Sequence, residues 1–176
     1  MRKIFSIAVL SLALIFLGNS AYAQYEQGDK LLNVGLNLGG TYGGSGVGVG
    51  ASYEQGIHDF ISVGAQVDLN TWNYGFGNYS WKYSFLTIGA RGSYHFGKHF
   101  VKNDKLDLYA GPALGYRITS YKTPDGYNGT YSDSFGGGVF FGAFVGARYY
   151  FKPNLGAFAE LGDNTSALKV GVALKF

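Results

Sequence analysis

Apolar residues alternate with small or polar residues along most of the chain after residue 30. The clearest case is the C-terminal segment SALKVGVALKF, in which Leu168, Val170, Val172, Leu174 and Phe176 occupy every second position. A period of two is typical of β-strands, and no window after residue 24 shows sustained helical periodicity. Eight such runs can be delimited, at residues 30–41, 46–56, 60–70, 81–96, 106–119, 135–151, 155–162 and 166–176.

The stretches between these runs are rich in turn-forming residues. The shortest are IHD, KPN and DNT, and the longest are TWNYGFGNYS and SYKTPDGYNGTYSDS. Segments of about ten residues with alternating polarity, separated by such turns, are the sequence signature of a transmembrane β-barrel. The pattern therefore predicts an all-β fold, an eight-stranded antiparallel up-and-down transmembrane β-barrel.

The chemical character of the two faces predicts which face points inward. In the run 60–70, Ile61, Val63, Ala65, Val67 and Leu69 alternate with Ser62, Gly64, Gln66, Asp68 and Asn70. A soluble sandwich would carry many Lys and Glu residues on its polar face, whereas this face is small and nearly neutral. It suits the narrow interior of a closed barrel. We therefore expect the aliphatic residues to face lipid and the polar residues to face the lumen.

Charged residues share the inward parity, as expected because an arginine facing lipid at mid-depth would cost about 2 to 4 kcal/mol. The candidate lumen charges are Glu54, Asp68, Arg91, Asp107, Arg117, Arg148, Glu160 and Lys169. We expect two layers of paired charges: Arg91, Arg148, Asp107 and Glu160 in the half nearer the short turns, and Arg117, Asp68 and Lys169 in the other half. Buried ions persist only with partners, so we interpret the layers as a stabilising polar core.

Several aromatic residues also take the inward parity. Phe140, Phe144, Tyr150 and Phe158 are expected to fill the lumen opposite glycines, which argues against a continuous water channel. In the run 81–96, Trp81, Tyr83 and Phe85 are inward and Lys82 is outward. Either a bulge shifts the register there, or that end of the strand rises above the membrane.

Residues 1–23 are predicted to be a secretory signal peptide. Arg2 and Lys3 precede an apolar run at residues 4–17, and Ala21-Tyr22-Ala23 fits a cleavage site. Cleavage would leave residues 24–176 as the barrel domain. An uncleaved membrane anchor is the alternative, but residues 4–17 are fewer than the roughly 20 that a spanning helix needs.

Composition excludes several classes of chemistry. The chain has no cysteine, which rules out disulfides, thiolate metal sites and a lipid-bearing cysteine. Without Arg2 and Lys3, 12 of the 14 basic residues remain against 11 acidic ones, a balance that gives no electrostatic case for nucleic acid. We expect no cofactor.

Several segments resemble a known family. They are LDLYAGPALGYR at 106–117, GAFVGARYYF at 142–151, LGAFAELG at 155–162 and the terminal LKVGVALKF. Together with the signal peptide, they resemble the small eight-stranded outer-membrane barrels typified by OmpX and the OmpA transmembrane domain, the "outer membrane protein beta-barrel" proteins of Gram-negative bacteria. The resemblance implies contact with outer-membrane lipid. It also implies that the barrel-assembly machinery reads the last strand and Phe176 as a signal.

The last strand is expected to close the barrel by pairing with the first, so that no edge is left in lipid. An even strand count places both chain ends and residues 57–59, 97–105 and 152–154 in the periplasm, with residues 42–45, 71–80, 121–134 and 163–165 outside. The candidate outer-loop contacts are Trp72, Tyr74, Phe76, Tyr79, Tyr121, Tyr127 and Tyr131. Aromatic girdles are also usual at membrane interfaces, and the sequence does not identify a loop partner.

The three histidines are the residues most relevant to catalytic or metal chemistry. His58, His95 and His99 all lie at or beside predicted periplasmic turns, and the four-residue spacing of His95 and His99 in a strand-turn region does not make a helical metal pair. Barrel enzymes that modify lipid A resemble serine hydrolases with a histidine near the outer leaflet, the opposite end from these. We expect no Ser/His/acid set to converge.

These observations favour a non-catalytic, monomeric outer-membrane barrel with a filled lumen. Its expected role is envelope structure or surface contact through the second and third outer loops. One alternative is porin-like passive transport or binding of a small or hydrophobic solute, and a lesser one is an enzyme that modifies lipid A. A secreted soluble barrel with an apolar ligand inside would require the aliphatic stripes to point inward.

Overall fold

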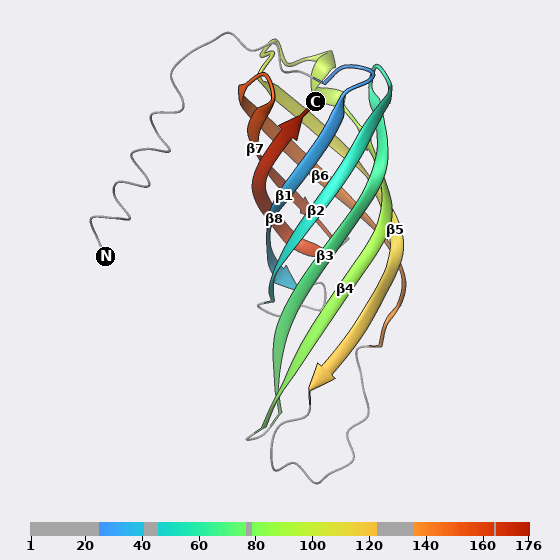
Figure 1. Ribbon diagram of the computed structural model, residues 1–176, viewed down its shortest axis with the longest axis vertical. Coiled ribbons are helices and arrows are strands. Elements are labelled where there is room, and N and C mark those ends of the chain that lie inside the picture. The colour runs from blue at the N-terminus through green and yellow to red at the C-terminus, as the bar shows by residue number, and fades with distance from the viewer. Residues whose placement is uncertain (1–24, 41–45, 77–78, 123–135, 164) are drawn as a thin grey trace, which may run out of the picture.

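The computed structural model describes residues 25–40, 46–76, 79–122, 136–163 and 165–176. Eight antiparallel strands form one closed barrel in which each strand pairs with its neighbours in the chain (Figure 1). The strands are β1 (Lys30–Gly40), β2 (Val47–His58), β3 (Ile61–Phe76), β4 (Tyr79–Tyr94), β5 (Leu106–Lys122), β6 (Gly138–Lys152), β7 (Leu155–Gly162) and β8 (Ser166–Lys175), with a short 3-10 helix η1 (Phe96–His99) after β4. This confirms the predicted fold class.

Within these ranges, no helix combines the length and the apolar character needed to cross a membrane. The predicted signal peptide, residues 1–23, lies outside the described residues.

The barrel closes between its first and last strands. β1 pairs antiparallel with β8, from Leu31 opposite Lys175 to Gly40 opposite Ser166. At the rim, Lys30 and Phe176 exchange backbone hydrogen bonds, with N···O distances of 3.1 and 2.9 Å. The expected closing pair is therefore present, and its hydrogen bonds extend to the last residue of the chain.

The two faces of the barrel wall have the predicted orientation. Aliphatic side chains point outward, as shown by Leu36, which is 57% exposed. Polar and charged side chains point inward, and Glu54 and Asp68 are fully buried. This polarity is the opposite of a soluble protein, and of a soluble carrier with an apolar lumen. A barrel with an apolar outer surface and a charged interior is stable only when hydrocarbon surrounds its wall.

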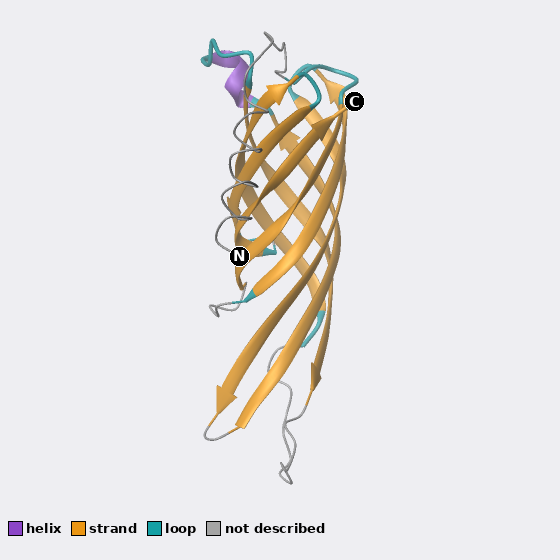
Figure 2. Cartoon of the chain, turned by 60° about the vertical axis from the view of Figure 1, so that its left-hand side comes forward, coloured by secondary structure: helices purple, strands orange, loops and turns teal. Residues whose placement is uncertain are grey.

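Three of the strands are longer than the others. β2 last pairs with β3 at Thr71, and β6 last pairs with β5 at Arg117. From this level outward, β3, β4 and β5 continue as a three-stranded sheet at the end opposite the C-terminus (Figures 1 and 2). We call this sheet, residues 71–76, 79–84 and 120–122, the projection.

The projection corrects the predicted second outer loop. Residues 71–76 and 79–80 are strand, so Trp72, Tyr74, Phe76 and Tyr79 lie on β3 and β4 rather than in a loop at 71–80. The physical reason is that these bulky residues keep the period of two. The polarity of the two faces is the reverse of that in the membrane part: Trp81 and Tyr83 are buried on the lumen side, whereas Asn73 and Lys82 on the outer side are exposed.

The third outer loop also begins later than predicted. β5 continues to Lys122, which places Tyr121 on a strand. Tyr127 and Tyr131 lie outside the described residues.

The structure also decides between the two explanations for Trp81, Tyr83 and Phe85. Pairing of β3 with β4 is continuous from Ile61 opposite Tyr94 to Phe76 opposite Tyr79, so there is no bulge. The strand end rises beyond the rest of the wall instead. The three aromatic side chains are buried and form one cluster, against which Trp72 packs.

Candidate functional site

The half of the lumen nearer the chain ends contains an interlocked set of charges. Arg91 on β4 pairs with Glu160 on β7, at 2.7 Å from Nη2 to Oε1, and with Glu54 on β2, at 3.2 Å from Nε to Oε1. Arg148 on β6 pairs with the same Glu54 oxygen at 3.1 Å and with Asp107 on β5 at 2.9 Å. Glu54 therefore bridges both arginines, and five strands are tied together across the lumen.

Each guanidinium in this network also lies over an aromatic ring. Arg91 Cζ is 3.9 Å from the ring centroid of Phe144, and Arg148 Cζ is 3.8 Å from that of Tyr109. The Tyr109 hydroxyl donates to Glu160 at 2.8 Å. Because cation–π contacts are strongest when desolvated, the rings stabilise the faces of the cations while carboxylates satisfy their edges.

Ser62, His95 and Asp107 form a hydrogen-bonded chain at the edge of this network. Ser62 Oγ is 2.9 Å from His95 Nε2, and His95 Nδ1 is 2.8 Å from Asp107 Oδ1. The expectation that no Ser/His/acid set would converge was wrong. The alternation along β4 could have indicated it. Arg91, Ser93 and His95 occupy every second position and are all buried, so the inward-facing positions of β4 continue into the turn that follows it.

The hydrogen bonds of Ser62 show why this chain of residues is not arranged as a nucleophile. Its hydroxyl donates to Glu54 Oε2 at 2.7 Å, so its single proton is not directed at His95. In a serine hydrolase, the histidine accepts the serine proton and the hydroxyl faces substrate. Here Ser62 is fully buried, and its proton is donated in a hydrogen bond to Glu54. The three residues extend the ion network instead.

Tyr25 covers this network on the side of the chain ends. Its ring stacks on His95, with centroids 3.6 Å apart and planes 3° from parallel. Its hydroxyl lies 2.6 Å from the Ile61 carbonyl oxygen and 2.8 Å from that of His58 and donates to them. Burial, with nearby carboxylates such as Asp29, raises the pKa of Tyr25 to about 12, so the hydroxyl stays a donor at neutral pH. No pattern in the sequence singles out this residue.

The other half of the lumen contains a simpler arrangement. Lys169 on β8 pairs with Asp68 on β3 at 2.6 Å, and the Asn37 amide donates to Asp68 at 2.9 Å. Gly50 lies directly opposite Asp68, and a Cβ at Gly50 would collide with the carboxylate. Arg117 is buried in the same half, and its Cζ is 5.6 Å from the Phe140 ring centroid.

The structure therefore places all eight candidate charges in the lumen. Seven of them meet in two groups: Arg91, Arg148, Glu54, Asp107 and Glu160 in one, and Asp68 and Lys169 in the other. The aromatic residues Tyr150, Phe158, Phe144 and Tyr109 are buried between the strands in the first half. Trp81, Tyr83 and Phe85 occupy the lumen side at the other end.

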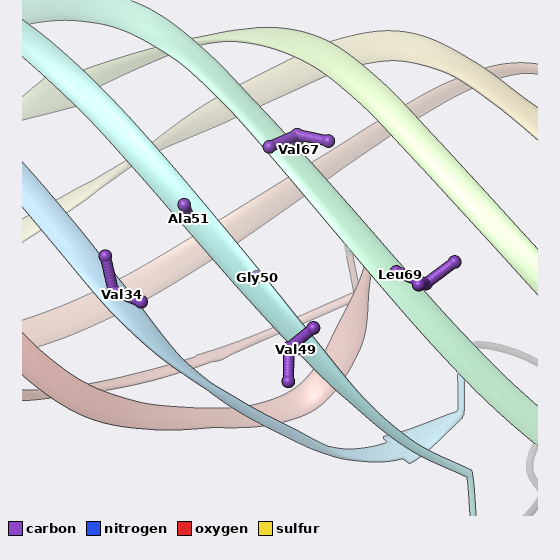
Figure 3. A pocket seen from close by; sticks show the side chains of 6 residues that line it. All are labelled: Val34, Val49, Gly50, Ala51, Val67 and Leu69. Atoms are coloured by element: carbon purple, nitrogen blue, oxygen red, sulfur yellow. The ribbon is translucent and has the colours of Figure 1, made fainter.

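A shallow apolar depression lies on the outside of the wall. Val34, Val49, Ala51, Val67 and Leu69 line it on β1, β2 and β3, beside Gly50 (Figure 3). It is part of the outward apolar surface and separate from the lumen charges. Over the described ranges, no group of three or more His, Asp or Glu side chains is arranged to hold a metal ion.

Comparisons with known proteins agree with this geometry. No protein-family model and no curated protein matches the chain. Among solved structures, OprG from Pseudomonas aeruginosa matches at 12% identity over 89% of this chain and 99% of its own, with a TM-score of 0.61. Ail, the attachment invasion locus protein of Yersinia pestis, matches at 11% identity over 85% and 95%, with a TM-score of 0.52.

Neisserial surface protein A is a further match, at 18% identity over 84% of this chain and 96% of its own, with a TM-score of 0.50. At such identities the likeness shows the fold alone. The chain has the fold of the small eight-stranded outer-membrane β-barrels, as the sequence resemblance implied. The charge network and the projection are features of this chain's own residues.

Proposed function

We propose that this protein is a monomeric, non-catalytic barrel of the Gram-negative outer membrane that serves envelope structure or surface contact and does not conduct solutes. The observation that carries the proposal is the cross-lumen ion network centred on Glu54, which joins Arg91 and Arg148 at 3.2 and 3.1 Å. A solute passing through would have to break these pairs, and an unpaired buried charge is strongly unfavourable.

The projection supports the choice of surface contact as the role. It extends three strands beyond the rest of the wall, and its outer face carries Asn73, Lys82 and Lys122, all exposed. This face lies beyond the apolar belt, so contact with hydrocarbon does not account for its side chains. Together with the candidate contact Tyr121, which is 39% exposed, they are available to a partner outside the cell.

The exposed terminal Phe176 supports recognition by the barrel-assembly machinery during biogenesis. It is 68% exposed at the rim where β1 and β8 close. An aromatic residue at this point is accessible to an assembly factor before the barrel closes, and afterwards lies at the lipid interface.

Topology can be tested with single-cysteine labelling, because the chain has no cysteine of its own. Asn73→Cys lies on the projection, and the matched control Lys102→Cys lies in the turn at the opposite end; both positions are exposed. On intact cells, a membrane-impermeant maleimide should label Asn73→Cys only, and Lys102→Cys should become reactive after the outer membrane is permeabilised. The reverse pattern would contradict the proposed orientation and localisation.

Conductance separates the proposed role from the porin-like alternative. The purified barrel, shown to be folded by its different gel mobility before and after boiling, should give no discrete ion currents in a planar bilayer. Steady unitary currents from the unmodified protein would show that the lumen is not closed by the ion network. A hydrolase assay on lipid A with the same sample addresses the enzyme alternative, for which Ser62→Ala is the matched variant.

A further inference from the structure

The outward face of the projection changes from apolar to cationic over three rows. Strand register aligns one residue from each of β3, β4 and β5 in every row. From the membrane outward, the rows are Leu69, Leu86 and Ile118; then Thr71, Ser84 and Ser120; then Asn73, Lys82 and Lys122. A hydroxyl row therefore separates the last aliphatic row from two ammonium groups.

The two lysines form an unfavourable pair as they stand. Lys82 and Lys122 are directly opposite each other on β4 and β5, and both are exposed. Like charges directly opposite on one face destabilise a sheet. No ion pair involving either lysine is found in the described part of the chain, and residues 71–76, 79–84 and 120–122 contain no Asp or Glu. An anion between the two ammonium groups would relieve this repulsion.

The lysine row lies just above the headgroup layer of a bilayer, within reach of its side chains. Successive rows on one face lie about 7 Å apart along a strand, which is roughly 5 Å in height at the usual strand tilt. The lysine row is then roughly 10 Å above the last aliphatic row, and the headgroup layer is about 5 to 8 Å thick. Because lysine stems bend toward the interface, both ammonium groups reach this layer, where the hydroxyl row already lies.

We propose that Lys82 and Lys122, with Ser84 and Ser120 of the hydroxyl row below them, bind the anionic, phosphate-bearing headgroup of an outer-leaflet lipid. The third hydroxyl of the row, on Thr71, already donates to the Val47 carbonyl oxygen at 3.3 Å. Ammonium and hydroxyl groups are donors that suit phosphate oxygens. The aliphatic row continues the same surface downward, so the acyl chains of that lipid lie against Leu86 and Ile118. This sequence of apolar, hydroxyl and cationic rows matches a lipid, whereas a soluble anionic partner would leave the aliphatic row unused. The inference rests on the proposed membrane function.

Lipid binding can be measured on the folded mature chain in neutral detergent micelles. Native mass spectrometry during titration with phosphatidic acid gives the affinity for the first bound lipid. The double variant Lys82→Gln/Lys122→Gln should bind roughly tenfold more weakly, given two cations near an anionic headgroup. The control Lys102→Gln/Lys152→Gln removes two exposed lysines at the opposite end and should bind like the unmodified protein.

The remaining arms identify the source of the recognised phosphate. Phosphatidylcholine has no net charge, because its choline cation balances its phosphate, and should bind equally to all variants. Lys82→Arg/Lys122→Arg should retain tight binding to phosphatidic acid. If both glutamine variants lost affinity for phosphatidic acid equally, or if neither lost affinity, the proposed site would be overturned. Competition by millimolar inorganic phosphate would overturn the lipid assignment in favour of a free anion. Heat-dependent gel mobility of each variant tests membrane-type folding separately, so failure of the lipid site and failure of the barrel proposal are distinguishable.

Discussion

The two halves of the lumen solve the problem of buried charge in different ways. Near the chain ends, two arginines and three carboxylates share partners, and Glu54 contacts both cations. In the other half, Lys169 and Asp68 form a single pair supported by the Asn37 amide. A shared network loses several contacts when one member is removed, whereas a single pair loses one. The difference predicts unequal sensitivity to mutation.

The largest effect is expected for Arg148→Met. The change leaves Asp107 without its arginine and removes one of the two cations that contact Glu54. Removing a shared cation from two buried carboxylates should cost about 3 to 5 kcal/mol of unfolding free energy, even though Glu54 keeps Arg91 and Asp107 keeps His95. Urea titration of the barrel in lipid vesicles, followed by gel mobility, measures this cost. The control Lys152→Met, at the exposed end of the same strand, should change stability by less than about 0.5 kcal/mol.

An intermediate effect is expected for Lys169→Met in the other half. Asp68 loses its cation but keeps the hydrogen bond from Asn37 at 2.9 Å, so we expect a loss of about 2 to 3 kcal/mol. Lys175→Met on the same strand removes a partly exposed pair with Asp29 and should cost less than about 1 kcal/mol. If Lys169→Met proved as costly as Arg148→Met in the same titration, sharing partners would give the network no special role.

The smallest effect is expected for Gly146→Ala, which tests packing within the network half. A Cβ at Gly146 would lie 2.5 Å from Tyr109 Cζ, and the Tyr109 ring is fixed by Arg148 and Glu160. Overpacking of this kind costs about 1 to 2 kcal/mol. Gly138→Ala on the same strand meets open space and is the matched control. The same unfolding measurement with equal stability for the two variants would show that the ring can move freely.

The sequence alone predicted the strands and their orientation because the wall obeys one rule. Where lipid surrounds the barrel, outward positions such as Val63 and Val67 must be apolar. The alternation of apolar and polar residues in the sequence therefore shows which side chains face outward. The projection was mistaken for a loop at residues 71–80 because that rule stops at the bilayer surface. Above it, Trp81 is buried and Lys82 is exposed, and the inverted pattern resembles a polar, aromatic loop.

The site was less predictable for a different reason. Parity places Arg91 and Glu54 in the lumen, but it does not say which strands face each other across it. That depends on the tilt and stagger of all the strands together. Ser62, His95 and Asp107 meet because the start of β3, the end of β4 and the start of β5 lie at the same end of the barrel. Tyr25 precedes β1, so the alternation within the strands says nothing about its position.

The closing hydrogen bonds between Lys30 and Phe176 have a consequence for biogenesis. The closing pair joins the first strand to β8, so the barrel cannot close before β8 has been synthesised. Any shorter piece of the chain has two unpaired strand edges and would be prone to self-association.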